Sequence, residues 1–531
     1  MLLRNKNATP AFLKESFNEL LLLKSLILAE NRKLIESVIG GSDTTLQRLY
    51  GQWLSTRNLL SREYAKPVKE RRGDIIQLEE QAESLQKEMN QKSAFLGNRQ
   101  RSKTISVSDV QSALQEEEAA IEFVSFVVTN ERNDSIMYAA HLLLKNNPVP
   151  VFIPLCTEKQ LQKLFDSAGS TATGMVNRIY RGIDLGTNNT AVSLGKELYN
   201  LIWAPLEPHL KGIKKISYTP SRKLFNIAFQ ALPADSSLLL MDKYEFRQYF
   251  STKQVVLRNE KVTTNTTGTL QPKNIFLFGD ASFNVAGKTT SKQPMKNKGT
   301  SGFYLPASRG NQNSLWTDLP GTAEEVKKIK KQFELNKVPA AVFTQTAASE
   351  ENLKALSGNS PQILHIATHG FFLPEQEKKS DDIVTNNQNA YTLANDPLLR
   401  SGLILSGGNH VWSGKTPIEG VEDGIATAYE ISQLNLSNTE LVVLSACETA
   451  LGDVRGSEGV FGLQRAFKMA GVKKMIVSLW QVPDKETAEL MTSFYNYWLK
   501  GKTIEQAFAQ AQSDMRKKYS PYYWAAFVLV E

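Results

Sequence analysis

Two residues of this 531-residue chain are placed to act as a nucleophile and its base. Cys447 follows the apolar run LVVLSA, and His369 follows the similar run ILHIAT. Both runs are typical of buried β-strands, and each ends on a reactive side chain. A cysteine attacks as the thiolate, and a neighbouring imidazole can take up the thiol proton and later protonate a leaving group. The pair therefore predicts covalent catalysis where two strands end.

Gly370 directly follows the candidate base. Because glycine has no side chain, its backbone N–H stays accessible. Together with the N–H of Cys447 it would form an oxyanion hole, in which each donor contributes about 3 to 4 kcal/mol.

Each of these residues also has a plainer interpretation. Cys447 alone would be a small buried apolar residue, and His369 alone a structural histidine. A zinc site is a further alternative, because His365 and His369 have H-x-x-x-H spacing. That motif needs a helix and a Glu after its first histidine, where this strand-like run has Ile366. We therefore expect His365 in the core, no metal and no cofactor.

The elements around the candidate pair indicate an α/β fold. Apolar strand-like runs alternate with amphipathic helical segments from about residue 271 to the last residue, and they include NIFLFG, VPAAVF, QILHIA, ELVVLSA and KKMIVSLW. This alternation predicts a mostly parallel sheet flanked by helices, in which ligands bind at the carboxyl ends of the strands. Thr322 with Glu325, and Thr503 with Gln506, are predicted capping boxes at helix starts.

The pattern of helix-like and strand-like segments divides the chain into three regions. Residues 1–105 are helical and almost free of strand signals, as expected of an interaction region. Residues 106–265 and 266–531 are two α/β regions. A stretch rich in Lys, Ser, Gly and Asn follows Asp280, and we interpret it as a loop.

Composition excludes several classes of protein. The formal net charge of +8 arises from 62 basic and 54 acidic residues spread along the chain, without a nucleic-acid recognition motif. The two cysteines make no disulfide framework, and no signal peptide opens the chain. No apolar run reaches the 18 or so residues of a membrane span. We expect a cytoplasmic protein that binds neither nucleic acid nor membrane.

A series of motifs resembles the CHAT domain, a caspase-like and separase-like group of cysteine peptidases often attached to TPR repeats. The motifs occur in one order: HIATHGFF, DPLLRSGLIL, EDGIATAYEI, ELVVLSACETALGDVRGSEGVFGLQRAF, VSLWQVPD and YYWAAFVLV. The resemblance implies a caspase-like peptidase domain over residues 266–531, a pseudo-caspase-like half before it, and the end of a TPR-like array or a helical hairpin over residues 1–105.

The resemblance also implies roles for the candidate residues. Cys447 would attack the scissile carbonyl of a protein substrate, and His369 would protonate the departing amine. Gly370 and Cys447 would supply the oxyanion N–H groups. A catalytically silent scaffold and a cysteine acyltransferase or transpeptidase remain alternatives.

Substrate-pocket residues follow from the caspase-like fold that the resemblance implies. That fold would line the P1 pocket with Asp280, Ser445, Ser478, Trp480 and Gln481. Asp280 at its base would favour Arg or Lys by charge pairing, or it stabilises a turn. Met or Leu would fit a pocket dominated by Ser445 and Trp480.

Two further acids have structural interpretations. Asp484 is expected to be an N-cap, and Asp423 either caps its helix or lines the cleft.

We expect activity to be gated by a protein partner that docks on the N-terminal helices. Self-cleavage at Lys378 or Lys379 is a further possibility of activation. The resemblance implies a role in bacterial defence or regulated cell death, such as cleavage of a pore-forming protein.

Overall fold

The computed structural model describes residues 9–24, 43–66, 70–97, 105–130, 133–168, 176–181, 189–235, 238–263, 270–284, 315–373, 396–445, 453–454 and 460–531. Cys447, Lys378, Lys379 and most of the predicted loop after Asp280 lie outside these residues.

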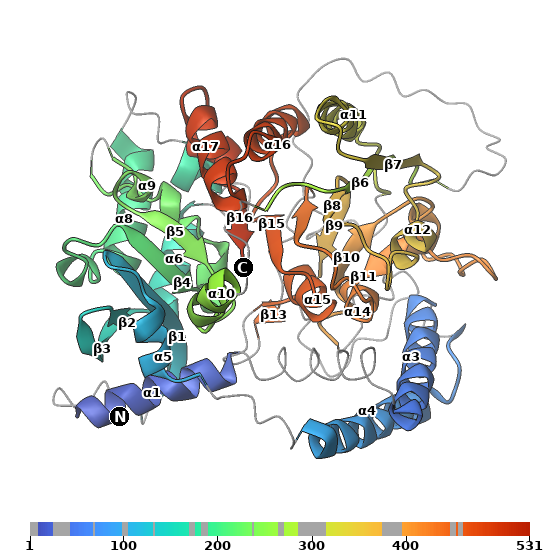
Figure 1. Cartoon of the computed structure of the whole chain (residues 1–531), viewed down its shortest axis with the longest axis horizontal. Coiled ribbons are helices and arrows are strands. Elements are labelled where there is room, and N and C mark those ends of the chain that lie inside the picture. The colour runs from blue at the N-terminus through green and yellow to red at the C-terminus, as the bar shows by residue number, and fades with distance from the viewer. Residues whose placement is uncertain are drawn as a thin grey trace.

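One 11-stranded sheet runs through the molecule in the order β3-β2-β1-β4-β5-β16-β15-β12-β8-β6-β7 (Figure 1). Its strands are β1 (Glu118–Asn130), β2 (Asn133–Leu144), β3 (Asn147–Thr157), β4 (Lys215–Thr219), β5 (Glu245–Gln248), β6 (Ile275–Ala281), β7 (Ala340–Gln345), β8 (Ile363–Ile366), β12 (Leu441–Leu444), β15 (Lys474–Ser478) and β16 (Phe527–Val530). Neighbouring strands are parallel along β1-β4-β5 and along β15-β12-β8-β6-β7. The strands β3, β2 and β1 pair antiparallel, and so do β15 and β16. The predicted fold class, a mostly parallel sheet flanked by helices, is confirmed.

The sheet contains two α/β units that meet at a narrow seam. The first unit (residues 105–263) supplies β1 to β5, and the second unit (residues 270–531) supplies the remaining strands. Across the seam, β5 and β16 pair only at Gln248 and Val530. Beside this pair lies a cleft of about 560 Å³, lined by β5, β16 and neighbouring helices.

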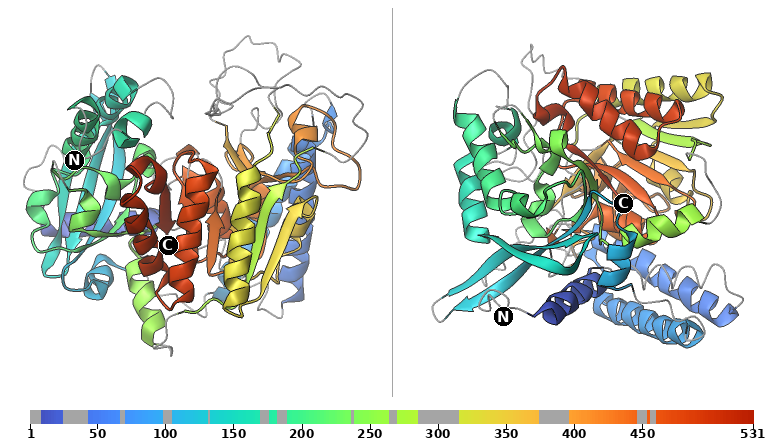
Figure 2. Two further views of the ribbon diagram at one scale, coloured as in Figure 1. Left: turned by 90° about the horizontal axis from the view of Figure 1, so that it is seen from above. Right: turned by 60° about the vertical axis from the view of Figure 1, so that its left-hand side comes forward.

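Helices cover both faces of the second unit. On one side lie α11 (Pro320–Leu335), α16 (Asp484–Leu499) and α17 (Ile504–Arg516), and on the other lie α14 (Ala428–Ile431) and α15 (Leu463–Met469) (Figures 1 and 2). The capping box of Thr503 and Gln506 opens α17 as predicted. The predicted capping box at Thr322 is wrong, because α11 already begins at Pro320, whose fixed φ suits a first helical position.

A small three-stranded sheet extends from the end of β8. It contains β9 (His369–Phe372), β10 (Ser401–Ile404) and β11 (Ile425–Thr427), all antiparallel. The remaining helical elements that serve as landmarks are α5 (Val107–Ala113), α6 (Glu158–Ala168), η2 (Asn177–Arg181), α8 (Asn189–Ile202), α9 (Leu240–Lys243), α10 (Gln254–Thr263), α12 (Glu350–Lys354), α13 (Asn409–Trp412) and α18 (Pro521–Trp524).

The N-terminal helices serve two different units. In α1 (Pro10–Leu23), Phe17 and Leu21 pack into a core shared with α5 and β1 of the first unit. Lys24 follows α1 and forms a buried ion pair of 2.8 Å with Glu122. The helices α3 (Thr44–Ala65) and α4 (Ile75–Gly97) instead form a hairpin with its own small core.

The α3–α4 hairpin contacts the second unit. The guanidinium of Arg57 lies 3.7 Å from the ring centroid of Tyr429 in α14. Thr416 donates a hydrogen bond of 2.7 Å to Glu70. Among the helices within the described ranges, none is long and apolar enough to cross a membrane.

Candidate active site

The candidate site lies where β8 and β12 end. These neighbouring strands are parallel, and Ile366 pairs with Leu444 at their last residues. His369 comes three positions after Ile366, and Cys447 comes three positions after Leu444 in the sequence. The structure thus describes His369 and the strand leading to the cysteine as far as Ser445, while Cys447 itself is outside the described residues.

The imidazole of His369 is oriented by a backbone carbonyl. Its Nε2 lies 2.8 Å from the carbonyl oxygen of Thr317, which precedes α11. Because a carbonyl only accepts hydrogen bonds, Nε2 must carry the proton. The neutral ring then has its lone pair on Nδ1, the atom that can accept a proton from a thiol.

Two aromatic rings flank the same imidazole. Its centroid is 5.1 Å from that of Phe283 and 4.9 Å from that of Trp316. The side chain of Asn409 in α13 holds the backbone of Trp316. It accepts a hydrogen bond of 2.8 Å from the backbone N–H and donates one of 2.9 Å to the backbone carbonyl. These residues could not be predicted from the sequence, because none of them belongs to the strand-end motifs.

Burial sets the protonation state of His369. It lowers the pKa of the imidazole below its usual value near 6.5, although the hydrogen bond to Thr317 and the nearby charge of Asp318 oppose this effect. The neutral form therefore dominates at pH 7, so the side chain is prepared to act as a base.

Gly370 is half-buried and lies opposite Leu403 of β10. The N–H of Leu373 donates to the carbonyl of Arg400, which makes these two residues a hydrogen-bonded pair. In antiparallel ladders such pairs alternate with pairs whose N–H groups point outward. The N–H of Gly370 therefore points away from β10.

A buried polar network lies beneath the strand ends. Ser445 donates to Glu325 Oε2 at 3.1 Å, and Glu325 Oε1 lies 3.1 Å from His365 Nε2. His365 Nδ1 is 3.2 Å from the hydroxyl of Tyr495. The two histidines of the H-x-x-x-H spacing thus have separate partners, since His369 contacts Thr317.

Asp484 brings a second acid to this region. Asp484 is the first residue of α16, and the N-cap of that helix is Pro483. The prediction that Asp484 is the N-cap is therefore wrong by one position. A Cβ on Gly321 would lie 2.2 Å from that of Asp484, so only glycine permits this close approach. Burial, followed by repulsion from Glu325, raises the pKa of the Asp484 carboxyl. Sequence reasoning missed this pair of acids because α11 and α16 are far apart in the chain.

Asp280 is engaged at the end of β6. Its φ of +52° is in the left-handed region, and its N–H donates to Thr322 Oγ1 at 2.9 Å. Its carboxylate accepts a hydrogen bond of 2.6 Å from Gln345, which ends the edge strand β7. These contacts stabilise the turn, and a role at the base of a P1 pocket stays a prediction.

The other predicted pocket residues lie around the end of β15. Ser478 is the buried last residue of that strand, and Gln481 is half-buried. Trp480 is buried, and its Nε1 donates to the carbonyl of Tyr522 at 2.9 Å. Asp423 accepts a hydrogen bond of 2.8 Å from the N–H of Ile425, at the entry to β11.

Within the described part of the chain, one acidic group has the spacing of a metal site. It comprises Glu350, Glu422 and Glu430. The ammonium of Lys354 lies 2.7, 2.9 and 3.0 Å from these three carboxylates and already occupies the position of a cation.

The mostly parallel sheet and the neutral imidazole at its carboxyl edge define an α/β protein with a candidate catalytic base at its strand ends. The chain belongs to the CHAT domain family, whose match covers residues 192–531. The resemblance inferred from the motifs is therefore confirmed.

Curated relatives include tetratricopeptide repeat protein 28 of Mus musculus and of Homo sapiens. The mouse protein is 25% identical over 225 residues, which are 41% of this chain and 9% of the relative. The human protein is 26% identical over 226 residues, or 41% of this chain and 8% of the relative. The chain thus spans less than a tenth of the length of these relatives.

Two solved structures show similarity at low sequence identity. The Saccharomyces cerevisiae separase–securin complex aligns with a TM-score of 0.40 and 9% identity, over 80% of this chain and 30% of that chain. The Arg-specific cysteine proteinase gingipain R aligns with a TM-score of 0.33 and 10% identity, over 70% of this chain and 74% of that chain.

Proposed function

We propose that this chain is a cysteine endopeptidase that uses Cys447 and His369. The observation that carries the proposal is the geometry of His369, a neutral imidazole with its Nδ1 lone pair at the end of β8. The adjacent parallel strand β12 leads directly to the cysteine in the sequence. Membership of the CHAT domain family supports the same assignment.

The reaction follows from these groups. The Cys447 thiol gives its proton to His369 Nδ1, and the thiolate attacks the carbonyl of a peptide bond. The N–H groups of Gly370 and Cys447 stabilise the oxyanion. The protonated His369 then donates its proton to the leaving amine, and water hydrolyses the acyl-enzyme with the same imidazole as base.

The substrate pocket is proposed to take Arg or Lys at P1. The resemblance implies Ser445 and Asp280 as pocket residues, and Ser445 contacts the buried acid Glu325. Asp484 adds a second carboxylate near Glu325. A basic side chain entering beside Ser445 would be paired by these acids, and this favours Arg or Lys over Met or Leu.

Gating is proposed to act through the α3–α4 hairpin. Arg57 of this hairpin contacts Tyr429 of α14, and α14 directly follows β11. The strand β11 pairs with β10, which pairs with β9, where His369 is the first residue. A protein partner that moves the hairpin would thereby reach the candidate base. We place this activity in the cytoplasm, in defence or regulated cell death, where a gated peptidase could activate a pore-forming protein.

The test is cleavage of a fluorogenic peptide panel with varied P1 residues by the purified chain and by its Cys447→Ala variant. We expect release only after Arg or Lys, and only with the intact cysteine. Equal release by both proteins would overturn the assignment. Transfer of the acyl group to an added amine, in place of hydrolysis, would favour the acyltransferase. Because the proposed peptidase is gated, inertness would favour the scaffold if it persists, with every peptide and toward cysteine-directed peptidyl electrophiles, in the presence of candidate partner proteins.

A further inference from the structure

We propose that Tyr180, a residue of the first unit, is a positioning residue for the substrate-site segment 478–484 of the second unit. This inference rests on the proposed function only in taking residues 478–484 as part of the substrate site. The positioning itself is a property of the fold and is testable without catalysis.

The segment 478–484 connects β15 to α16 at the edge of the sheet that carries the candidate site. Ser478 is held in the sheet by its pairing with Phe527 of β16. At the other end, Asp484 packs against Gly321 of α11. Trp480 lies between these two anchored ends, so the position of its indole influences the path of the whole segment.

A side chain of the first unit packs directly on this indole. The rings of Tyr180 and Trp480 stack with centroids 4.8 Å apart and an interplanar angle of 17°. Both side chains are buried, with 2% and 4% of their surface exposed. Aromatic pairs at this separation are favourable beyond the apolar area that they bury.

Each ring is also fixed within its own unit. The hydroxyl of Tyr180 accepts a hydrogen bond of 3.1 Å from the N–H of Ala228. Trp480 Nε1 donates to the carbonyl of Tyr522 in α18. Tyr180 itself belongs to η2, a short π-helical turn, and such turns are often found at functional sites. The stack therefore joins two rigid supports across the boundary between the units.

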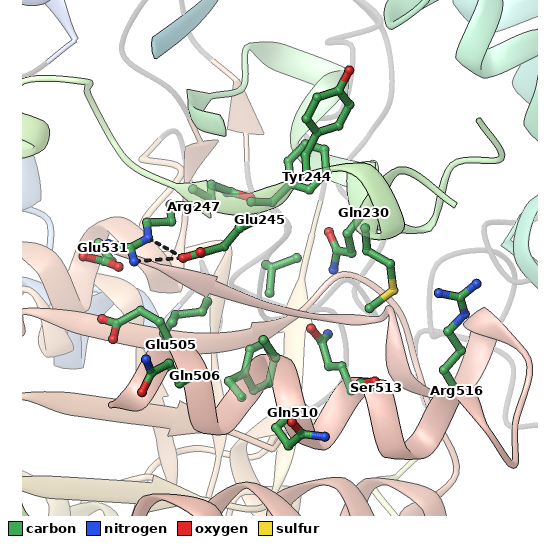
Figure 3. Close-up of a pocket in the computed structure, with 18 of the residues that line it drawn as sticks. Gln230, Tyr244, Glu245, Arg247, Glu505, Gln506, Gln510, Ser513, Arg516 and Glu531 are labelled. Atoms are coloured by element: carbon green, nitrogen blue, oxygen red, sulfur yellow. Dashed lines mark hydrogen bonds and ion pairs between the residues drawn. The ribbon is translucent and has the colours of Figure 1, made fainter. Parts of the chain in front are cut away.

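Within the sheet, the two units meet at a narrow seam. The sheet crosses it by one residue pair, and a cleft of about 560 Å³ lies beside that pair. Figure 3 shows the cleft between β5 and α17, with Gln230 and Tyr244 on one side and Gln510 and Ser513 on the other. Two ion pairs lie in its lining: Arg247 with Glu245 within the first unit, and Arg516 with Asp242 across the seam. The pair of Arg516 and Asp242 is therefore a contact across the seam that does not involve residues 478–484.

The first measurement is hydrogen exchange at the backbone amides of residues 479–482. It uses the Cys447→Ala protein, so that activity plays no part. Adding Tyr180→Ala should raise these exchange rates by about tenfold, the size expected for loss of one aromatic contact. Tyr180→Phe, which keeps the stacked ring and loses only the hydrogen bond from Ala228, should raise the rates clearly less than Tyr180→Ala does.

The matched control is Arg516→Ala, which breaks the pair with Asp242 across the same seam. It should leave the exchange of residues 479–482 unchanged. An equal rise with Arg516→Ala would show a general loosening of the two units and overturn the proposal, as would unchanged exchange with Tyr180→Ala. If Tyr180→Ala does not fold, Trp480→Leu serves as the second variant, and unchanged exchange there has the same meaning.

The second measurement is the kinetics of an active protein. Tyr180→Ala should raise KM about tenfold with kcat changed less than about threefold, because the disordered segment must be ordered when substrate binds. A fall in kcat at constant KM would contradict positioning of a binding segment. If the wild-type chain cleaves no peptide even in the presence of candidate partner proteins, the proposed function fails, whereas the exchange experiment still decides the role of Tyr180.

Discussion

Each of the two α/β units contains one cysteine, and the two cysteines are placed differently. In the first unit, Cys156 lies on β3 and His141 on the neighbouring strand β2, and both are buried inside the sheet. In the second unit, His369 and Cys447 each come three positions after the end of a parallel strand. The residue types are the same, but Cys156 and His141 are buried within neighbouring antiparallel strands, whereas His369 and Cys447 follow the ends of neighbouring parallel strands in the sequence.

Burial makes Cys156 and His141 of the first unit chemically unreactive. Burial raises the pKa of the Cys156 thiol to about 11, so the reactive thiolate is scarce at pH 7. Burial, aided by the charge of Lys24, lowers the pKa of His141 to about 4. A cysteine and a histidine thus become candidates for catalysis when both follow the carboxyl ends of neighbouring parallel strands, and burial within antiparallel strands makes the same residue types inert.

The largest expected effect separates the two cysteines. Cys447→Ala should lower the peptidase rate by about 10⁴-fold or more, because it removes the nucleophile. Cys156→Ala, the matched control, should leave kcat/KM within about twofold, because its thiol is inert. The measurement is cleavage of the fluorogenic peptides. A large loss with Cys156→Ala and none with Cys447→Ala would reverse the comparison.

The pH dependence of kcat/KM should report the second unit's histidine. The pKa of His369 is lowered, so the neutral base is present at pH 7 and is lost as the pH falls through a value below about 6.5. Below that value the rate should fall about tenfold per pH unit. The check is a pH profile of the wild-type chain beside His369→Gln, whose residual rate should lack this limb. A limb that persists in the variant would assign it to another group.

Glu325 should matter for stability as well as for the site. Glu325→Ala removes the partner of Ser445 and of His365, so we expect a loss of about 2 to 4 kcal/mol in the free energy of unfolding. The control is Glu324→Ala, on the exposed side of the same helix, with an expected change within about 0.5 kcal/mol. Urea unfolding of the two variants gives both values, and equal values would mean that the network contributes nothing.

The smallest effect concerns His141 in the first unit. Its folded pKa of about 4 lies below the unfolded value near 6.5, so the unfolded state takes up the proton first as the pH falls. Stability is therefore present above pH 6.5 and declines toward pH 4, by about 2 kcal/mol between pH 7 and 5. His141→Phe should remove this component from unfolding curves at the two pH values. An unchanged difference in the variant would assign the pH dependence to other groups.

The strand ends could be predicted because they depend on local patterns. The apolar runs before His369 and Cys447 predict β8 and β12, and parallel pairing then brings their ends together. Thr503 and Gln506 likewise cap a helix by a contact of short range.

Features that depend on distant partners could not be predicted in this way. Glu325 resembles a capping-box residue, yet it contacts Ser445, 120 positions away. Asp280 follows an apolar strand-like run as the candidate catalytic residues do, but its carboxylate accepts a hydrogen bond from Gln345 of the edge strand β7. The helix α1 looks continuous in pattern with the helices after it, whereas the buried pair of Lys24 and Glu122 attaches it to the first unit. The sequence around each of these side chains does not indicate which distant residue it contacts.

The most direct test of the central claim is covalent labelling by a peptidyl acyloxymethyl ketone with Arg at P1. Mass spectrometry of the digested protein then locates the adduct. We predict a single adduct on Cys447, none on Cys156, and labelling slowed by about 100-fold or more in His369→Gln. Labelling of both cysteines at similar rates, or labelling of Cys447 that does not depend on His369, would contradict it.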